Sequence, residues 1–561
     1  MLPATEPYVD KGGVSVKRRE FLLATLGGAG AAMASQALRG LGGAAAAPQK
    51  GGQVIVGLSQ EPTVFNPLKP HIEVDRGVHM CLFDALWRMN PQGQFVPNLA
   101  AAIPTVENGG ISKDGLQYTI HLRRGVTWHD GAPFTAADVE FTHQFIMNPK
   151  FDAATRVGYD GIASLTTPDP STVVLRLSKP YAPMLALWSD TYIVPKHVLG
   201  SVTDLNNNAF DTKPIGTGPF TFGERVAGDH ITLEANRTYY GAGPYLDRVI
   251  FKYIPDLTVM FTRFQTGDID VTGIQGITVD HFDEAKRLKG VTLHTGPTNF
   301  VEYLWFNLGR PQFQDKVVRE ALYLGMDKQS YIQRIYYGVP PDSESYLAPS
   351  SWAFNPNLPK HEYNPEKARA RLEEAGWKVG ADGIRAKNGV RLSFSNSTTA
   401  GNKVREQAQA FLQQNWKAIG VDMQIKDMPA AVVWGDYFFK SQFDSVTVGW
   451  NIWGEAGGDP NVLNWFGSGY IPVKSGKGSN TTQYVNEKMD RLAEEGVSVV
   501  GQEKRKPIYR QIQAILREDL PVLPIFYYVN IEGTKAGLQN YQQNANLVSN
   551  VWNANAWWWA K

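Results

Sequence analysis

The period of the apolar positions changes repeatedly along the chain, which predicts strands and helices in alternation. Tyr118, Ile120 and Leu122 alternate with polar residues, the period of a half-buried strand. Similar short runs predict strands at residues 53–58, 172–177 and 421–425. Helical spacing predicts helices at residues 78–87, 404–419 and 508–516. Asp315, Asp327 and Asn364 are candidate N-caps and predict helices at residues 315–324, 327–336 and 365–375. A helix that runs directly into a strand, as at Gly420, is typical of an α/β fold.

Two local motifs refine this pattern. Thr135 and Asp138 have the spacing of a capping box, and Phe134 and Val139 flank it as a hydrophobic staple. Residues 214–220 form a glycine-rich connector that no Lys-Ser/Thr pair follows, so they do not form a phosphate-binding loop.

The N-terminal segment has the features of an export signal. Arg18 and Arg19 precede Phe21 and a Gly/Ala-rich apolar run that ends in four alanines at Ala47. A charged region, an apolar region and a small-residue cleavage site predict a signal peptide over residues 1–47, of the twin-arginine type. No Cys stands at the junction, and no later apolar run is long enough to span a bilayer. We expect a soluble periplasmic protein without a lipid anchor.

Composition limits the function classes. The 561 residues exceed what one hydrophobic core supports, so two or three lobes are expected. The net charge is +1, without a basic cluster beyond the N-terminus, which argues against nucleic-acid binding. HExxH and GxSxG motifs are absent, so a secreted hydrolase is only a remote alternative, and we predict no enzyme and no cofactor. His129, in a turn, is predicted to make a structural hydrogen bond.

Several segments in order resemble one family. These are residues 118–139, 214–220, 267–270, 303–307, 318–322, 363–368 and 458–460. Each is weak alone, but their order and spacing are similar to extracytoplasmic solute-binding protein family 5, the substrate-binding proteins of peptide-, dipeptide-, oligopeptide- and nickel-type ABC importers.

This resemblance implies a two-lobed α/β periplasmic-binding-protein fold, type II, of the large class with an extra subdomain and a hinge. Lobe I would comprise residues 48–297, with the extra subdomain at about 90–213, and lobe II residues 298–526. Residues 527–561 would return to lobe I. The chain would cross between lobes near residues 296–301 and 525–529.

The resemblance also implies function. A monomer would capture a peptide or peptide-like small-molecule solute by closing its lobes, without chemistry or cofactor. It would deliver the solute to an ABC permease and, through it, to ATPase subunits. An oligosaccharide, an opine or a metal complex is the alternative solute class. For a metal or haem carrier, His71 and His79 are candidate ligands, eight residues apart.

The family suggests ligand-contacting residues in both lobes. In lobe II they are Trp450, Asn451, Trp453 and Glu455. The indoles of Trp450 and Trp453 offer flat apolar faces with one hydrogen-bond donor each. In lobe I they are Glu73 and Asp75, a carboxylate pair suited to a cationic group, with Phe65 and Tyr159 as aromatic walls. The alternatives are core positions for the aromatic residues, a solvated acid pair, and a turn at Asp459.

Two departures argue against a dipeptide ligand. Peptide-binding relatives carry an Asp in the loop after Trp450, whereas Glu455 is the nearest acid before Asp459 here, in a loop about two residues longer. Dipeptide binders resemble one another in an Arg near residues 397–403, where this chain has none, and Arg405 follows on the predicted helix. Oligopeptides, modified peptides, opines and oligosaccharides stay open.

Overall fold

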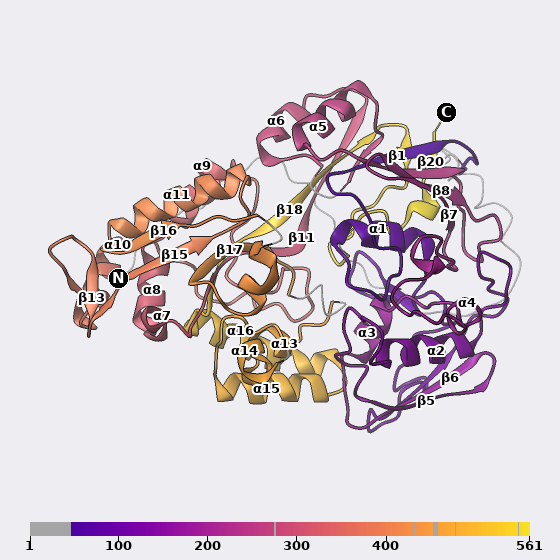
Figure 1. Ribbon diagram of the computed structural model, residues 1–561, viewed down its shortest axis with the longest axis horizontal. Coiled ribbons are helices and arrows are strands. Elements are labelled where there is room, and N and C mark those ends of the chain that lie inside the picture. The colour runs from indigo at the N-terminus through magenta and orange to yellow at the C-terminus, as the bar shows by residue number, and fades with distance from the viewer. Residues whose placement is uncertain are drawn as a thin grey trace, which may run out of the picture. The chain divides into compact units, whose positions relative to one another are not determined.

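A ten-stranded mixed sheet runs through both halves of the molecule. The computed structural model describes residues 47–273, 276–429, 432–452, 458–476, 478–547 and 549–560, of which Pro48 onwards belong to one compact unit. The strand order is β16-β15-β17-β11-β18-β10-β1-β9-β8-β7 (Figure 1). The predicted signal peptide lies outside the described residues, except for Ala47. No helix in the described ranges is both long and apolar enough to cross a membrane.

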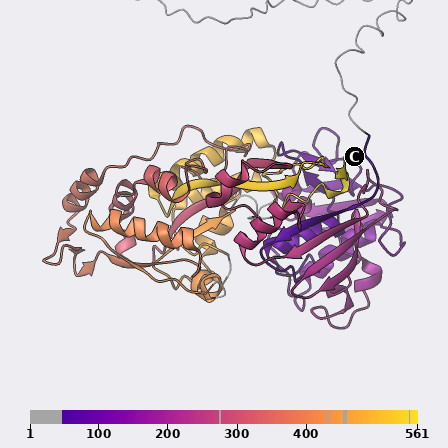
Figure 2. The same cartoon turned by 90° about the horizontal axis from the view of Figure 1, so that it is seen from above.

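Two long strands join the halves of this sheet. β11 (Val291–Phe306) and β18 (Val522–Lys535) pair antiparallel over most of their lengths. Their register shifts between Pro297 and Val301, where residues 298–300 lie opposite Tyr528 alone. Figure 2 shows β18, in yellow, passing from one half of the molecule into the other. A register shift of this kind bends a strand pair locally.

Four hydrophobic clusters fall on the two sides of this crossing. Two of them comprise buried residues between Val54 and Ala285 together with residues after Ile531. The other two lie between Val301 and Tyr527. We call the first pair and its chain segments lobe I, and the second pair lobe II. The chain passes between the cores within β11 and β18.

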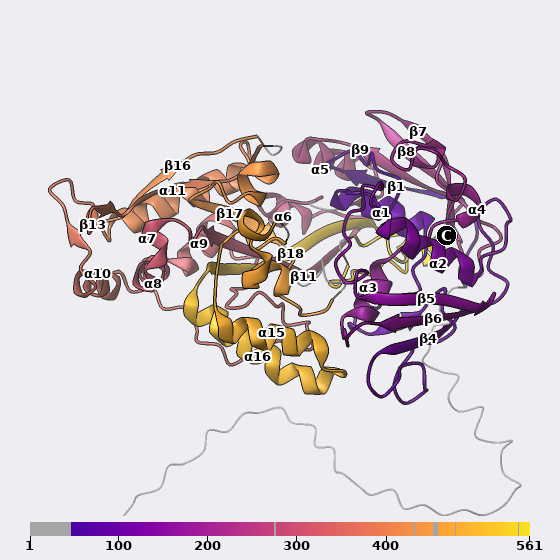
Figure 3. The same ribbon diagram turned by 60° about the horizontal axis from the view of Figure 1, so that its bottom comes forward.

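Lobe I contains the N-terminal half of the sheet. β1 (Gln53–Leu58) lies parallel to β10 (Val271–Thr272) and β9 (Arg248–Tyr253), and β8 (His230–Ala235) and β7 (Phe220–Val226) extend the sheet antiparallel. α1 (Glu73–Leu82) lies on the side of lobe I that faces lobe II (Figures 1 and 3). α5 (Leu257–Thr266) is N-capped by Asp256.

An insertion in lobe I forms a smaller layer. β4 (Gln117–His121), β6 (Thr172–Leu177) and β5 (Ile162–Asp169) make a three-stranded antiparallel sheet. The associated elements are α2 (Ala136–Met147), α3 (Met184–Asp190), α4 (Lys196–Leu199) and the hairpin of β2 (Trp87–Met89) with β3 (Phe95–Pro97). We call this layer the subdomain. Its core is continuous with that of lobe I.

Lobe II contains the other half of the large sheet. β15 (Ser393–Ser397) lies parallel to β16 (Asp422–Ile425) and β17 (Ser445–Trp450), and β17 pairs with β11. Its longer helices are α8 (Lys316–Leu324), α9 (Lys328–Ile335), α10 (Pro365–Glu374), α11 (Lys403–Lys417), α15 (Glu487–Ser498) and α16 (Gln502–Asp519). The α/β class predicted from the sequence is confirmed.

Short elements complete the fold. The strands are β12 (Lys378–Val379), β13 (Arg385–Lys387), β14 (Val390–Arg391), β19 (Leu538–Gln539) and β20 (Trp558–Trp559). The helical turns are η1 (Ala209–Asp211), η2 (Val279–His281), α6 (Phe282–Ala285), α7 (Pro311–Gln314), η3 (Val433–Tyr437), α13 (Leu463–Phe466), η5 (Ser468–Tyr470), α14 (Pro472–Ser475) and η6 (Ala554–Ala556).

Most predicted helix starts are present. Asp315, Asp327 and Asn364 accept backbone hydrogen bonds at the starts of α8, α9 and α10. The Thr135 N–H donates to Asp138 at 2.9 Å, as the capping box requires. The helix predicted over residues 78–87 is wrong in its range, because α1 begins at Glu73 and ends at Leu82.

Contacts from a distant loop explain why α1 ends early. The Gly218 N–H donates to the Leu82 carbonyl at 2.9 Å. His129 holds this loop, since its Nδ1 accepts from the Gly216 N–H at 3.1 Å and its Nε2 donates to the Gly218 carbonyl at 3.0 Å. Burial lowers the pKa of His129 to about 4, so the ring is neutral, as this bonding pattern requires. The predicted structural role of His129 is confirmed.

Gly216→Ala should destabilise the protein, because an added Cβ would lie 1.8 Å from the Leu82 carbonyl oxygen. We expect the free energy of unfolding to fall by about 3 kcal/mol, measured by urea denaturation. Gly469→Ala is the matched control, since its Cβ would meet nothing within 4 Å. Equal stability of the two variants would contradict the tight packing of this loop.

Candidate functional site

An aromatic cluster surrounds the end of β17 in lobe II. The Trp450 ring stacks on Phe438, with centroids 5.6 Å apart, and meets Trp465 edge-on at 5.0 Å. Trp434 and Phe439 complete the cluster at 6.4 Å each. Trp450 is half-buried, and its Nε1 has no hydrogen-bond partner among the described residues. The ring therefore keeps an unused donor at the point where the chain leaves the sheet.

The loop that follows Trp450 is described only at its ends. Asn451 is buried at 7% exposure. Trp453 and Glu455 lie outside the described residues. At the far end, Asp459 makes two 2.7 Å contacts with Arg505 of α16 and also accepts the Asn461 N–H at 3.1 Å. Asp459 thus starts a turn, as predicted, and in addition fixes the loop to α16 through a buried ion pair.

The two lobe I acids have different surroundings. Asp75 is fully buried, and its carboxylate accepts the backbone N–H groups of Thr63, Val64 and Ile72 at 2.7, 3.0 and 2.9 Å. Glu73, in the first turn of α1, is half-buried. Burial raises the pKa of Glu73 to about 7, against a smaller lowering by Arg76. Asp75 organises the loop before α1, whereas burial disfavours the ionised form of Glu73.

Phe65 and Tyr159 are parts of the lobe I core. Phe65 is 3% exposed and meets Phe222 edge-on at 5.1 Å. The Tyr159 hydroxyl lies 2.6 Å from the Thr191 hydroxyl, and its ring meets Trp188 edge-on at 6.1 Å. Their packing gives both side chains a structural role, and a ligand contact stays a prediction for each.

A buried ion pair lies beside the irregular segment of the β11–β18 pair. Arg405, in the first turn of α11, donates to both carboxylate oxygens of Glu302 at 2.8 and 2.9 Å. It also donates to the Tyr528 hydroxyl at 2.9 Å, which itself donates to Glu302 at 2.7 Å. The Glu302 side chain is 0% exposed and that of Arg405 is 13% exposed. Glu302 therefore neutralises the guanidinium of Arg405, the residue that follows the segment where dipeptide-binding relatives carry an Arg.

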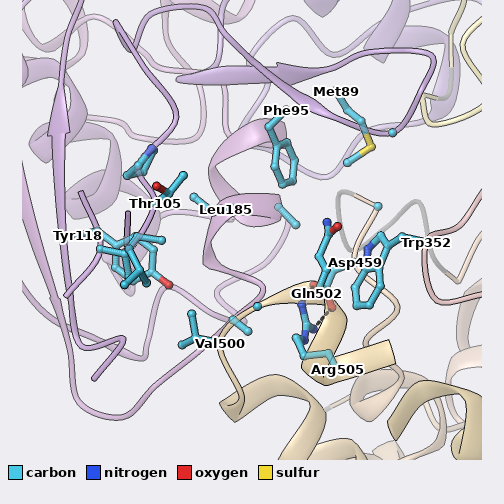
Figure 4. Close-up of a pocket in the computed structure, with 18 of the residues that line it drawn as sticks. Met89, Phe95, Thr105, Tyr118, Leu185, Trp352, Asp459, Val500, Gln502 and Arg505 are labelled. Atoms are coloured by element: carbon cyan, nitrogen blue, oxygen red, sulfur yellow. Dashed lines mark hydrogen bonds and ion pairs between the residues drawn. The ribbon is translucent and has the colours of Figure 1, made fainter. Parts of the chain in front are cut away.

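A cavity of about 210 Å³ lies between the subdomain and lobe II. Its wall includes Phe95, Tyr118 and Leu185 on one side and Trp352 and Arg505 on the other (Figure 4). No sequence motif marks these residues as lining a cavity. Tyr118 belongs to the strand predicted from its period-2 pattern, which is the same whether a core or a cavity lies behind it. Trp352 stands in an irregular segment that carries no motif.

The histidines considered for a metal are both bound to backbone. His71 Nδ1 donates to the Lys69 carbonyl and His79 Nε2 to the Val64 carbonyl, each at 2.7 Å, and the ring centroids are 5.1 Å apart. Burial lowers the pKa of both rings. Among the described residues, no group of three or more His, Cys, Asp or Glu side chains could hold a metal ion.

Glu73→Gln should stabilise the free protein in a pH-dependent way. Because the folded pKa is raised from 4.5 to about 7, the folded state binds more protons than the unfolded state between these values. The stability of the wild type therefore falls as the pH rises through this window, and the variant should lack this loss. We expect the melting temperature of Glu73→Gln to exceed that of the wild type at pH 8 and to match it at pH 4. Asp75→Asn, a control on the same helix, should melt lower at both values, and a pH-independent effect of Glu73→Gln would contradict the assignment.

Arg405→Met should lower the free energy of unfolding by about 3–5 kcal/mol, because it leaves the Glu302 carboxylate buried without its partner. Urea denaturation of the variant, and of Arg405→Met combined with Glu302→Met, measures the loss and its recovery. Lys440→Met is the control, since its pair with Asp436 is 61% and 70% exposed, and a change below about 1 kcal/mol is expected there. A similarly small change for Arg405→Met would contradict the role given to the pair.

Comparisons of the sequence and of the structure with known proteins identify relatives of this chain. The family model of bacterial extracellular solute-binding proteins, family 5 Middle, matches residues 94–471. The oligopeptide-binding protein AppA of Bacillus subtilis is 30% identical over 529 residues, covering 92% of this chain and 93% of that protein. The structure of AppA from Bacillus subtilis in complex with a nonapeptide superimposes with a TM-score of 0.80 and 29% identity, covering 92% of this chain and 100% of the other.

A second solved structure carries a different ligand. NikZ from Campylobacter jejuni in complex with Ni(L-His) has a TM-score of 0.79 and 28% identity, covering 90% of this chain and 99% of that one. The two-lobed periplasmic-binding-protein fold predicted from the sequence is thereby confirmed. The chain belongs to family 5 of the bacterial extracellular solute-binding proteins.

Proposed function

We propose that this chain is the exported substrate-binding component of an ABC importer and that it encloses an oligopeptide or peptide-like solute between its lobes. It passes the solute to a membrane permease, whose ATPase subunits supply the energy. The chain works as a periplasmic monomer, without catalysis or a cofactor, after a twin-arginine-type signal over residues 1–47 directs its export. Lobe I spans residues 48–297, lobe II residues 298–526, and residues 527–561 return to lobe I.

The observation that carries this proposal is the 30% identity to an oligopeptide-binding protein over 92% of the chain. The sheet supports it, because β11 and β18 extend through both lobes and shift their register between them. Rotation about a few residues of such a connection is how hinge closure proceeds.

The site residues favour a ligand longer than a dipeptide. Arg405 is occupied by Glu302, so its guanidinium is not free to take the carboxylate of a short peptide. Trp450 offers a ring face and an unused N–H donor, and Asn451 follows it. Glu73 gains a partner when a ligand presents a cation. Trp453 and Glu455 belong to the loop that completes the contact, and Phe65, Asp75 and Tyr159 hold the lobe I wall.

A metal complex is the second candidate, favoured by the similarity to NikZ bound to Ni(L-His). His71 Nδ1 and His79 Nε2 donate to backbone carbonyls, which leaves the other ring nitrogen of each residue for such a ligand, the usual arrangement of metal-ligating histidines. Opines and oligosaccharides lack an observation of this kind.

A thermal-shift panel tests the proposal on the purified full chain. It contains alanine-based peptides of three, five and nine residues, an opine, an oligosaccharide and the nickel–histidine complex. A ligand at about one hundred times its dissociation constant adds about 2.7 kcal/mol of stability, so a binder raises the melting temperature clearly. We expect the nine-residue peptides to give the largest shift. A shift from the nickel complex alone would replace the peptide proposal with the second candidate.

Trp450→Ala should weaken peptide binding about tenfold or more, because it removes both the ring face and the N–H donor. Trp450→Phe separates these roles, since it keeps a ring and loses the donor. Trp416→Phe is the control, because Trp416 is fully buried in lobe II and donates to the Leu322 carbonyl at 2.8 Å. Calorimetric titration should show a loss of stability without a loss of affinity for the control. Unchanged affinity of Trp450→Ala would show that Trp450 does not contact the peptide and has a structural role only.

A further inference from the structure

The cavity between the subdomain and lobe II has walls from both. Phe95 of β3, Tyr118 of β4 and Leu185 of α3 line it from the subdomain. Trp352, Asp459 and Arg505 line it from lobe II (Figure 4). Since the walls belong to different lobes, the cavity exists only while the lobes stand in this arrangement.

Asp459 and Arg505, which both lie on the wall, form an ion pair with each other. Both Asp459 oxygens contact Arg505 at 2.7 Å, and Arg505 also donates to the Gly496 carbonyl at 2.6 Å and the Tyr509 hydroxyl at 3.0 Å. The guanidinium lies 5.4 Å from the centre of the Trp352 ring. The remaining wall is largely aromatic and aliphatic. Apart from Asp459, Arg505 and the polar residues Thr105, Glu107 and Gln502, the wall consists of aromatic residues, apolar residues and glycine, so most of the surface suits an apolar group.

The outer rim of the cavity is closed by direct contact. The Ala182 N–H of the subdomain donates to the Val497 carbonyl of α15 at 2.6 Å. Beside it, Gly115 approaches Val500 so closely that an added Cβ would lie 2.6 Å from the Val500 side chain. Figure 3 shows α15 and α16 next to the subdomain. The subdomain and lobe II therefore touch directly beside the cavity.

The inner side of the cavity adjoins the proposed ligand loop. Trp450 ends β17 at the start of this loop, and Gly458 and Asp459 at its other end line the cavity. The volume is also adequate, because a cavity of about 150 Å³ lined by apolar side chains binds benzene, and this one measures about 210 Å³.

From these observations we infer that the cavity is a distal pocket for one aromatic or branched apolar side chain of an elongated ligand held at Trp450. The inference rests on the proposed function and deepens it. The subdomain then contacts one side chain of the ligand, and an occupied pocket adds contacts that hold the subdomain against lobe II.

The test uses the purified full chain and nonapeptides of alanine in which a single Phe occupies each position in turn. Burying a Phe side chain should raise affinity about tenfold or more at one position far from the anchored end, measured by calorimetric titration against the all-alanine nonapeptide. Leu185→Trp fills the pocket and should abolish this gain while leaving the all-alanine nonapeptide within about twofold of its wild-type affinity.

Matched variants keep the result interpretable. Val96→Trp is the control, because Val96 is the exposed neighbour of Phe95 on the same strand and does not line the cavity. Phe95→Ala removes part of the wall from the other side and should also reduce the gain, so the test does not depend on Leu185→Trp folding. A gain at no position, or a gain that both pocket variants retain, overturns the inference but leaves peptide capture standing. Binding of no nonapeptide by the wild type overturns the proposed function and this inference together.

Discussion

The pairing of β11 with β18 is the constraint on which the rest of the structure depends. These strands belong to the sheet of both lobes, so each lobe can pack its own core while sharing one hydrogen-bonded connection. Arg405 binds Glu302 of one strand and Tyr528 of the other, and therefore ties both strands to α11 of lobe II. This tie lies next to residues 298–300, where the pairing of the two strands is irregular.

The same ion pair shapes the chemistry of the site. A buried guanidinium needs a partner, and Glu302 supplies it from within the protein, so a ligand carboxylate has no part in satisfying Arg405. The other candidate groups differ from this pair: the buried N–H of Trp450 has no hydrogen-bond partner among the described residues, and burial raises the pKa of Glu73 to about 7.

Local signals predicted much of the fold, and distant contacts account for what they missed. Asp315, Asp327, Asn364 and the Thr135 capping box specify their helices through residues two or three positions away, and all are found. The end of α1 was missed because Gly218, far along the sequence, decides it. For the site, the sequence marked Trp450 and Glu73 by residue type. The sequence could not show that Glu73 and Asp75 have different roles. The three N–H groups that donate to Asp75 come from a loop whose path no sequence pattern specifies.

The loop after Trp450 links the end of β17 to the lobe II surface that contacts the subdomain. Asp459 is held by Arg505 in α16, and α16 follows directly on the Val497–Val500 segment that contacts the subdomain. The buried ion pair therefore joins the end of this loop to the lobe II surface against which the subdomain rests. The subdomain, which could be taken for an insertion that merely enlarges lobe I, thus provides a second place where lobe I and lobe II meet. Contact at two separated places fixes the angle between the lobes more firmly than the two-strand connection alone, because a strand pair resists stretching better than it resists bending.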